Sequence, residues 1–129
     1  MFLNDDIAKL LLRLTAGIMM LFHGIEKIIN GINGVKGMVR GAGLPEFIAY
    51  GVYIGELIVP IFLIFGLYAR VASVFLAINM LMAIFLAYRG SLFELGKYGA
   101  PVIELPLFYL VLAISIFLLG SGKYAVNAK

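Results

Sequence analysis

The stretch AYGVYIGELIVPIFLIFG, residues 49–66, has the length and composition of a helix that crosses a membrane. Its only charged residue is Glu56, and most of its other positions are apolar. A helix over 46–66 would be about 31 Å long at 1.5 Å per residue, which matches a hydrocarbon core of about 30 Å. Three similar runs cover residues 7–29, 70–88 and 101–120. We therefore predict an all-α integral membrane protein, a four-helix bundle whose helices run up-down-up-down.

The composition of the whole chain supports this prediction. Hydrophobic residues fill 64% of the 129 positions and the mean hydropathy is +1.09. Soluble domains are about 45–50% apolar, so the excess is expected to face the lipid bilayer, and we treat 1–129 as one membrane domain. The net charge of +3 is not gathered into a basic stripe, so no nucleic-acid partner is expected. The absence of cysteine excludes disulfides and thiolate ligation of an iron–sulfur cluster by this chain.

The connections between the runs predict how the chain is threaded. Only residues 67–69 separate the second run from the third, which indicates a tight hairpin. The two long connections, 30–45 and 89–100, should then emerge together at the end opposite the N-terminus. Their apolar residues predict that they lie at the membrane interface or cap the bundle.

Two features bear on the orientation of the chain. Asp5 and Asp6 stand where a signal peptide needs basic residues, so we expect the first run to be retained. Lysine and arginine are divided equally between the two sides, and the positive-inside rule is therefore undecided. Because the longer loops favour translocation of their side, we expect a cytoplasmic N-terminus.

Ionisable residues inside the apolar runs are the best indication of a site. The free energy of inserting such a residue near the middle of a membrane is at least about 2.5–3.5 kcal/mol on insertion scales. Each of them therefore needs an interaction partner or a functional role. Glu56 lies about 15 Å into the second run, so we expect it to be protonated, paired or facing a wet cavity. Alternating helix directions place His23, Glu26 and Glu104 in the same long-loop half, within a depth of about 10 Å. Arg13 and Arg70 fall in the opposite half.

From this arrangement we name three candidate catalytic residues and a wider set of candidate ligand-binding residues. The catalytic candidates are Glu56, Glu104 and His23. The ligand-binding candidates are His23, Glu26, Lys27, Tyr53, Glu56, Glu104 and Tyr109. Phenol and carboxylate groups beside apolar walls suit a quinone head or a similar flat molecule.

Each of these residues also has a purely structural interpretation. His23, Glu26 and Lys27 stand three and four residues apart, so they could satisfy one another and the lipid headgroups at a helix end. Tyr53 and Tyr109 could pack with one satisfied hydroxyl. One histidine is too few for a carboxylate-bridged di-iron site or a bis-histidine haem within this chain, and we expect no metal site. Asn79 is expected to make a hydrogen bond between helices.

Three stretches resemble the DoxX family of small prokaryotic membrane proteins. They are LLRLTAGIMMLFHGIEKI (11–28), GELIVPIFLIFGLYAR (55–70) and GAPVIELPLFYLVLAISIFLLGSGKYAV (99–126). The shared marks are HG-x-x-K from His23 to Lys27, the Glu at 56, G-x-x-x-R from Gly66 to Arg70, Glu-x-Pro at 104–106 and G-x-G-x-Y at 120–124. The resemblance implies a four-helix bundle in the inner membrane of a prokaryote.

The resemblance implies more than one function. Some members are described as the small subunit of an archaeal thiosulfate:quinone oxidoreductase, others belong to oxidative-stress complexes, and similar animal proteins look like assembly factors. The family often has an aromatic residue before the last Glu, where this chain has Ile103, which weakens the case for a stacked ligand.

Three hypotheses follow. The first is a redox-associated subunit that binds a quinone or similar lipophilic molecule. No electron-transfer cofactor is evident in the chain, so a partner oxidoreductase subunit would supply that centre. The second is a membrane chaperone or assembly factor with no enzymatic activity. The third is a small transporter, which would require a homo-oligomer because four short helices make a thin wall for a pore. Whether the chain takes part in catalysis stays open at this point.

Overall fold

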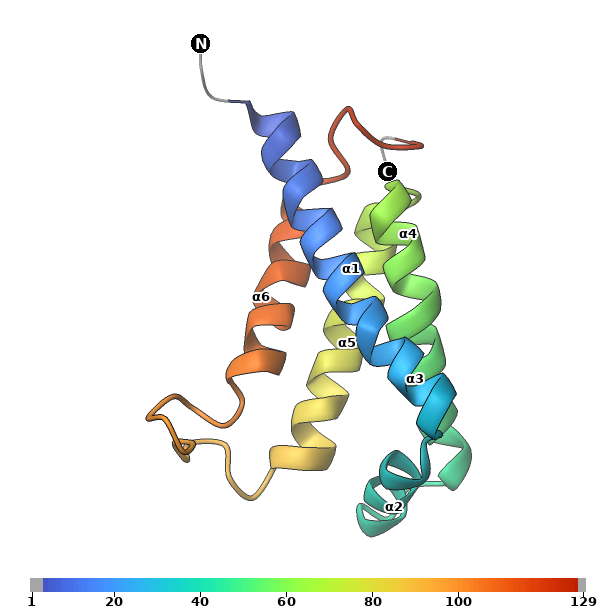
Figure 1. Ribbon diagram of the computed structural model, residues 1–129, viewed down its shortest axis with the longest axis vertical. Helices are drawn as coiled ribbons and strands as arrows, with labels where there is room; N and C mark the ends of the chain where they lie inside the picture. Colours follow the sequence, from blue (N-terminus) through green and yellow to red (C-terminus); the bar gives the residue numbers. More distant parts are fainter. Residues whose placement is uncertain (1–3, 128–129) are drawn as a thin grey trace.

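The computed structural model describes residues 4–127, and this part of the chain is all-α (Figure 1). Its helical segments in chain order are α1 (Asp5–Asn30), α2 (Asn33–Gly41), η1 (Glu46–Tyr50), α3 (Gly51–Tyr53), η2 (Ile54–Ile58), α4 (Val59–Phe65), α5 (Ala69–Tyr88) and α6 (Glu104–Leu119). Three helical stretches are long and apolar enough to cross a membrane: Asp5–Asn30, Glu46–Phe65 and Ala69–Tyr88. The chain is therefore a multi-pass membrane protein.

The helix α1 begins and ends at residues that suit a helix terminus. Asn4 caps it, and its side-chain oxygen accepts a hydrogen bond from the backbone N–H of Ile7 at 3.1 Å. Asp5 and Asp6 follow in the first turn, where carboxylates oppose the positive end of the helix dipole. At the other end Gly31 adopts a φ of 80°, which a glycine accepts without strain, and the helix stops there.

The second predicted helix is a continuous rod, but its hydrogen-bond pattern changes along its length. It starts as the 3₁₀ turn η1, passes through the short helix α3 into the π turn η2, and only then becomes the regular helix α4. In the π turn the N–H of Val59 donates to the carbonyl of Ile54, five residues earlier. Pro60 follows directly and has no N–H to donate to the carbonyl of Glu56, which favours a break in the regular pattern here.

The fourth predicted helix is shorter than the run 101–120 suggested. The helix α6 has 16 residues, or about 24 Å, because residues 101–103 remain in the preceding loop. The N–H of Val102 donates to the carbonyl of Glu94 at 3.0 Å, and Leu95 forms a β-bridge with Pro101. These loop contacts compete with helical ones and delay the start of the helix to Glu104.

The first long connection contains a helix that the sequence pattern did not reveal. Gly-rich residues 33–41 form α2, which crosses the end of the bundle below α1 (Figure 1). Val39 and Ile32 are buried there with Ala49, so the apolar residues of this connection cap the bundle as expected. The second long connection instead extends away from the helices, and its Phe93 is 97% exposed.

Both long connections lie at the same end of the molecule, and the C-terminal tail closes the other end (Figure 1). This placement confirms the predicted threading of the chain. Between the two ends the outer surface carries many exposed large apolar side chains, including Phe22 and Leu118 at 65% and 70%. The structure thus has the lipid-facing belt that its composition required.

Candidate functional site

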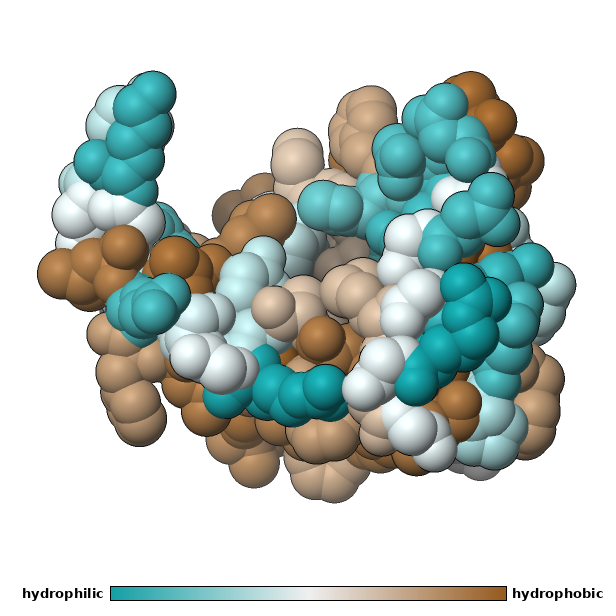
Figure 2. Space-filling model, turned by 90° about the horizontal axis from the view of Figure 1, so that it is seen from below, coloured by the Kyte–Doolittle hydropathy of each residue, from teal (hydrophilic) through white to brown (hydrophobic). Residues whose placement is uncertain are grey.

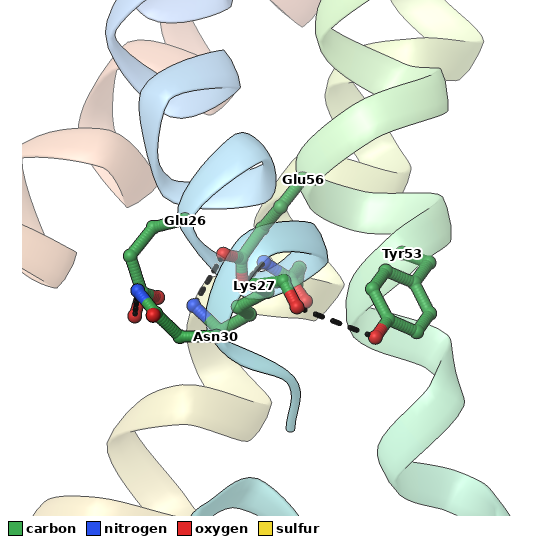
Figure 3. Close-up of polar contacts among 6 residues, drawn as sticks. Glu26, Lys27, Asn30, Tyr53 and Glu56 are labelled. Atoms are coloured by element: carbon green, nitrogen blue, oxygen red, sulfur yellow. Dashed lines mark hydrogen bonds and ion pairs between the residues drawn. The ribbon is translucent and has the colours of Figure 1, made fainter.

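An ion pair between two helices lies at the centre of the candidate site. The Nζ atom of Lys27, near the end of α1, is 2.7 Å from Oε1 of Glu56 in the π turn η2 (Figure 3). The other carboxylate oxygen accepts a hydrogen bond from the Asn79 side-chain amide of α5 at 3.4 Å. The Glu56 side chain is only 9% exposed and that of Lys27 19%. Three helices therefore share one partly buried polar cluster, and Glu56 is paired.

Two glycines allow these helices to come close enough for the cluster to form. A Cβ atom added to Gly24 of α1 would stand 2.1 Å from the backbone oxygen of Glu56. A Cβ atom added to Gly55 would stand 2.5 Å from Cγ of Asn79. Small residues that permit such backbone contact are typical of helix packing in membranes. The π turn, which proteins often place at functional sites, then directs Glu56 inward.

A cavity of about 230 Å³ opens beside the ion pair, and we call it the head cavity. Lys27 and Glu56 line it together with His23 and Tyr109. The His23 ring meets the Tyr109 ring edge to face, with 6.0 Å between their centroids. Most of the remaining wall is apolar and consists of Met20, Met80, Ala83, Ala87, Leu105 and Pro106. The cavity thus combines a charged pair, an imidazole and the phenols of Tyr109 and Tyr88 with hydrophobic walls.

The structure separates the other predicted residues from this cavity. Tyr53 is half-buried one turn before Glu56, and its hydroxyl donates to the carbonyl of Lys27 at 3.5 Å. Glu26 is exposed on the far side of α1 from Tyr53, and it accepts a hydrogen bond from Asn30 at 3.2 Å (Figure 3). Glu104 is also exposed, in the first turn of α6. Tyr53 thus supports the backbone of the site, whereas Glu26 and Glu104 lie in the same half of the bundle but outside the cavity.

A comparison with known protein families finds a match that covers much of this site. A sequence model described as DoxX matches residues 8–89, which include both members of the ion pair and the whole π turn. The chain belongs to the DoxX family. The match ends before α6, so it does not include Tyr109 or Glu104.

Two relatives resemble this DoxX protein over most of its length. A protein of Bacillus subtilis (strain 168) named "Putative oxidoreductase CatD" is 34% identical over 119 residues, which cover 92% of this chain and 81% of the relative. An uncharacterized protein of Haemophilus influenzae is 31% identical over 121 residues, covering 92% of this chain and 87% of the relative. No solved structure matches the chain.

The residues of this site have the chemistry to form hydrogen bonds with a ligand and to exchange protons with it. They form no evident metal centre. Among residues 4–127, no three His, Asp or Glu side chains gather closely enough to hold a metal ion. Lys27 and His23 can donate hydrogen bonds to a ligand, and Glu56 can accept one. Because apolar walls surround these groups, a charge or proton placed here interacts more strongly than it would in water.

Sequence reasoning found the charged residues of the site but underestimated the roles of Asn79, Met20 and Met80. Asn79 was expected only to link helices, and it does so by holding the Glu56 carboxylate itself. The apolar wall residues Met20 and Met80 were not recognised as part of a site, because methionine in a membrane helix carries no distinguishing signal. The pairing of Lys27 with Glu56 could have been suspected from the rule that a buried charge needs a partner.

Proposed function

We propose that this DoxX protein is a redox-associated membrane subunit that binds a quinone or a similar lipophilic molecule in the head cavity. It would act as a four-helix bundle in the prokaryotic cytoplasmic membrane, with α6 as a short fourth span and a cytoplasmic N-terminus. The observation that carries this proposal is the Lys27–Glu56 ion pair, which lines an apolar cavity inside a membrane protein. Burying an ion pair in that environment costs desolvation free energy, so its presence calls for a ligand or a structural requirement that retains it.

The cavity supplies the contacts that a quinone head needs. The Lys27 ammonium can donate a hydrogen bond to a ligand carbonyl, and the Tyr109 phenol can donate a second one from α6. His23 and Glu56 can exchange protons with a ligand whose carbonyls become hydroxyls on reduction. The electrons would come from a partner oxidoreductase subunit. The name of the Bacillus relative, an oxidoreductase, supports a redox role.

A second candidate function is assembly of a membrane complex. The loop between α5 and α6 presents Phe93 and Tyr98, which are 97% and 90% exposed. Large exposed aromatic side chains are typical of protein contact sites. A chaperone or assembly factor would use this loop to hold its client, and the head cavity would then need no ligand.

Glu56→Gln is the test that separates these functions. Removal of the carboxylate charge leaves the Lys27 ammonium unpaired in a low-dielectric site, which disturbs its position. We expect the binding of a radiolabelled short-chain benzoquinone to protein in nanodiscs, measured by scintillation proximity, to weaken at least about tenfold, or about 1.4 kcal/mol.

Glu26→Gln is the matched control, because Glu26 is an exposed carboxylate on the same turn of α1 as Lys27. It should leave quinone binding unchanged. Equal binding by both variants, or no saturable binding by the unaltered protein, would contradict the proposal and favour the assembly function.

A further inference from the structure

A second cavity, of about 240 Å³, lies on the other side of the Glu56–Asn79 contact, and we call it the tail cavity. It is bounded by α2, by the η1–α3–η2 segment and by α5. Its walls are almost entirely aliphatic, with Val39, Val52, Met82 and Leu86 among them. Asn79 is the one polar side chain among the described residues that line it. An apolar cavity of about 150 Å³ already binds benzene, so this one has room for a hydrocarbon ligand.

A third hollow, of about 130 Å³, lies between the two cavities and shares lining residues with each. It shares Lys27 and Glu56 with the head cavity, and it shares Val52, Asn79 and Met82 with the tail cavity. The third hollow therefore adjoins both cavities, and the ion pair lines this hollow and the head cavity. Figure 2, viewed from the long-loop end, shows the molecule hollowed near its centre, with hydrophobic residues inside a largely hydrophilic rim.

The mouth of the tail cavity faces the lipid. Ile54, Phe75 and Ile78 line it and are 51%, 49% and 53% exposed on the outer surface of the bundle. A hydrocarbon chain can therefore enter the cavity directly from the bilayer. Polar groups meet such a chain at the inner end alone, where Asn79 holds the Glu56 carboxylate.

We infer that the tail cavity holds the linear hydrocarbon tail of the same molecule whose polar head lies at Lys27 and Glu56. The inference rests on the proposed function and narrows its ligand class to an amphiphile with a hydrogen-bonding head and a long apolar tail. The charges of Lys27 and Glu56 line the head cavity and the third hollow, and Asn79 lies between these charges and the apolar walls of the tail cavity. This order of polar and apolar surfaces matches the head and the tail of such a molecule.

The test is photocrosslinking with a decyl-tailed benzoquinone that carries a diazirine at the end of its tail. In unaltered protein in nanodiscs, we expect the label on tail-cavity residues such as Val39 and Met82. An excess of the tailless benzoquinone should reduce this label, because its head competes for the ion pair. A phospholipid with a diazirine in its acyl chain reports whether bulk lipid fills the cavity instead.

Gly51→Leu adds a large side chain at the edge of the tail cavity. Gly51 lines it, and a Cβ atom added there meets no atom within 4 Å, so the substitution need not displace the backbone. We expect the label on Val39 and Met82 to fall at least about tenfold, in proportion to occupancy. Gly34→Leu is the matched control, because Gly34 is also exposed and has equal free space but does not line the tail cavity. It should leave the label unchanged.

The outcomes distinguish the two proposals. If the tailless benzoquinone binds in a manner sensitive to Glu56→Gln but the tail labels only outer residues such as Phe22 and Leu118, the tail site is wrong and the head site stands. Label in the cavity that the tailless competitor does not reduce, or that the phospholipid probe reproduces equally, also overturns the tail site. If neither quinone binds saturably, both proposals fall. The labelling and competition in unaltered protein require no variant to fold.

Discussion

Gly24 is the residue on which the geometry of the site depends most directly. It is buried where α1 meets the π turn, and a Cβ atom there would overlap the carbonyl of Glu56. Such an overlap with backbone cannot be relieved by a rotamer change, so the two helices would have to move apart. Lys27 is one turn further along α1, and its 2.7 Å contact with Glu56 would lengthen as a result.

We therefore expect Gly24→Ala to destabilise the protein by about 1–3 kcal/mol, the usual cost of overpacking. The melting temperature in detergent and the binding of short-chain benzoquinone measure the two consequences, and both should fall. Gly34→Ala is the control, because its added Cβ meets no atom within 4 Å. There the loss of unfolded-state freedom should make alanine neutral or stabilising by up to about 1 kcal/mol. Equal effects of the two substitutions would show that the close approach at Gly24 does not matter.

At the scale of elements, the C-terminal tail is fastened to the bundle by Arg13 of α1. The Arg13 side chain is fully buried, and its Nε donates to the carbonyl of Ser121 at 2.9 Å. Its Nη1 donates to the carbonyl of Leu63 at the end of α4 at 2.9 Å, and its Nη2 donates to the carbonyl of Tyr124. The guanidinium thus donates hydrogen bonds to backbone carbonyls of a helix end and of the tail together.

Arg13→Lys should release the tail. The ammonium group of lysine lacks the planar guanidinium fork with which Arg13 reaches three carbonyls at once. A hydrogen bond from a charged donor contributes about 1.5–3 kcal/mol, so the loss of one should raise the open population at least about tenfold. The chain has no cysteine, and Ser121 is 1% exposed, so Ser121→Cys provides a unique buried probe. Its reaction with maleimide should accelerate in the Arg13→Lys background.

Gly90→Cys, at an exposed loop position, is the control for this experiment. Its reactivity should not depend on residue 13. A Ser121→Cys thiol that stays protected in the Arg13→Lys background would show that other contacts hold the tail. One such contact is the bond from the Lys123 N–H to Asp6 at 3.0 Å.

The whole molecule has two unlike ends, and this difference makes its orientation testable. One end carries α2 and the extended loop, and the C-terminal tail lies at the other end (Figure 1). If α6 spans the membrane despite its 16 residues, the bilayer must thin locally or its flanking residues must reach the interface. The exposed Phe93 and Tyr98 of the preceding loop would then lie at the headgroup level.

A cytoplasmic N-terminus predicts that the two long connections share the outer side. Single cysteines at Gly34 and Gly90 should react with a membrane-impermeant maleimide in intact cells with a permeable outer layer. Lys123→Cys, in the tail, should react only after lysis. The reverse pattern would invert the orientation, and a difference between Gly34 and Gly90 would contradict a bundle of four spans.

The sequence by itself determined the class of the protein and the neighbourhood of its site. Four long, mainly apolar runs in one short chain expose too much apolar surface for water and require lipid, and the short hairpin at 67–69 leaves one way to thread them. The cost of a charge in an apolar helix likewise marked Glu56 as a residue that needs a partner.

Tertiary structure decided which residues meet. Spacing along one helix cannot show that Lys27 faces Glu56 while Glu26 faces outward, because that depends on how α1 is rotated against its neighbours. The rotation follows from close contacts at Gly24 and Gly55 and from the π turn before Pro60, and these depend on packing between segments distant in sequence. For the same reason Arg13 looked like a charge at a helix end, whereas its partners are carbonyls 50 and 108 residues away.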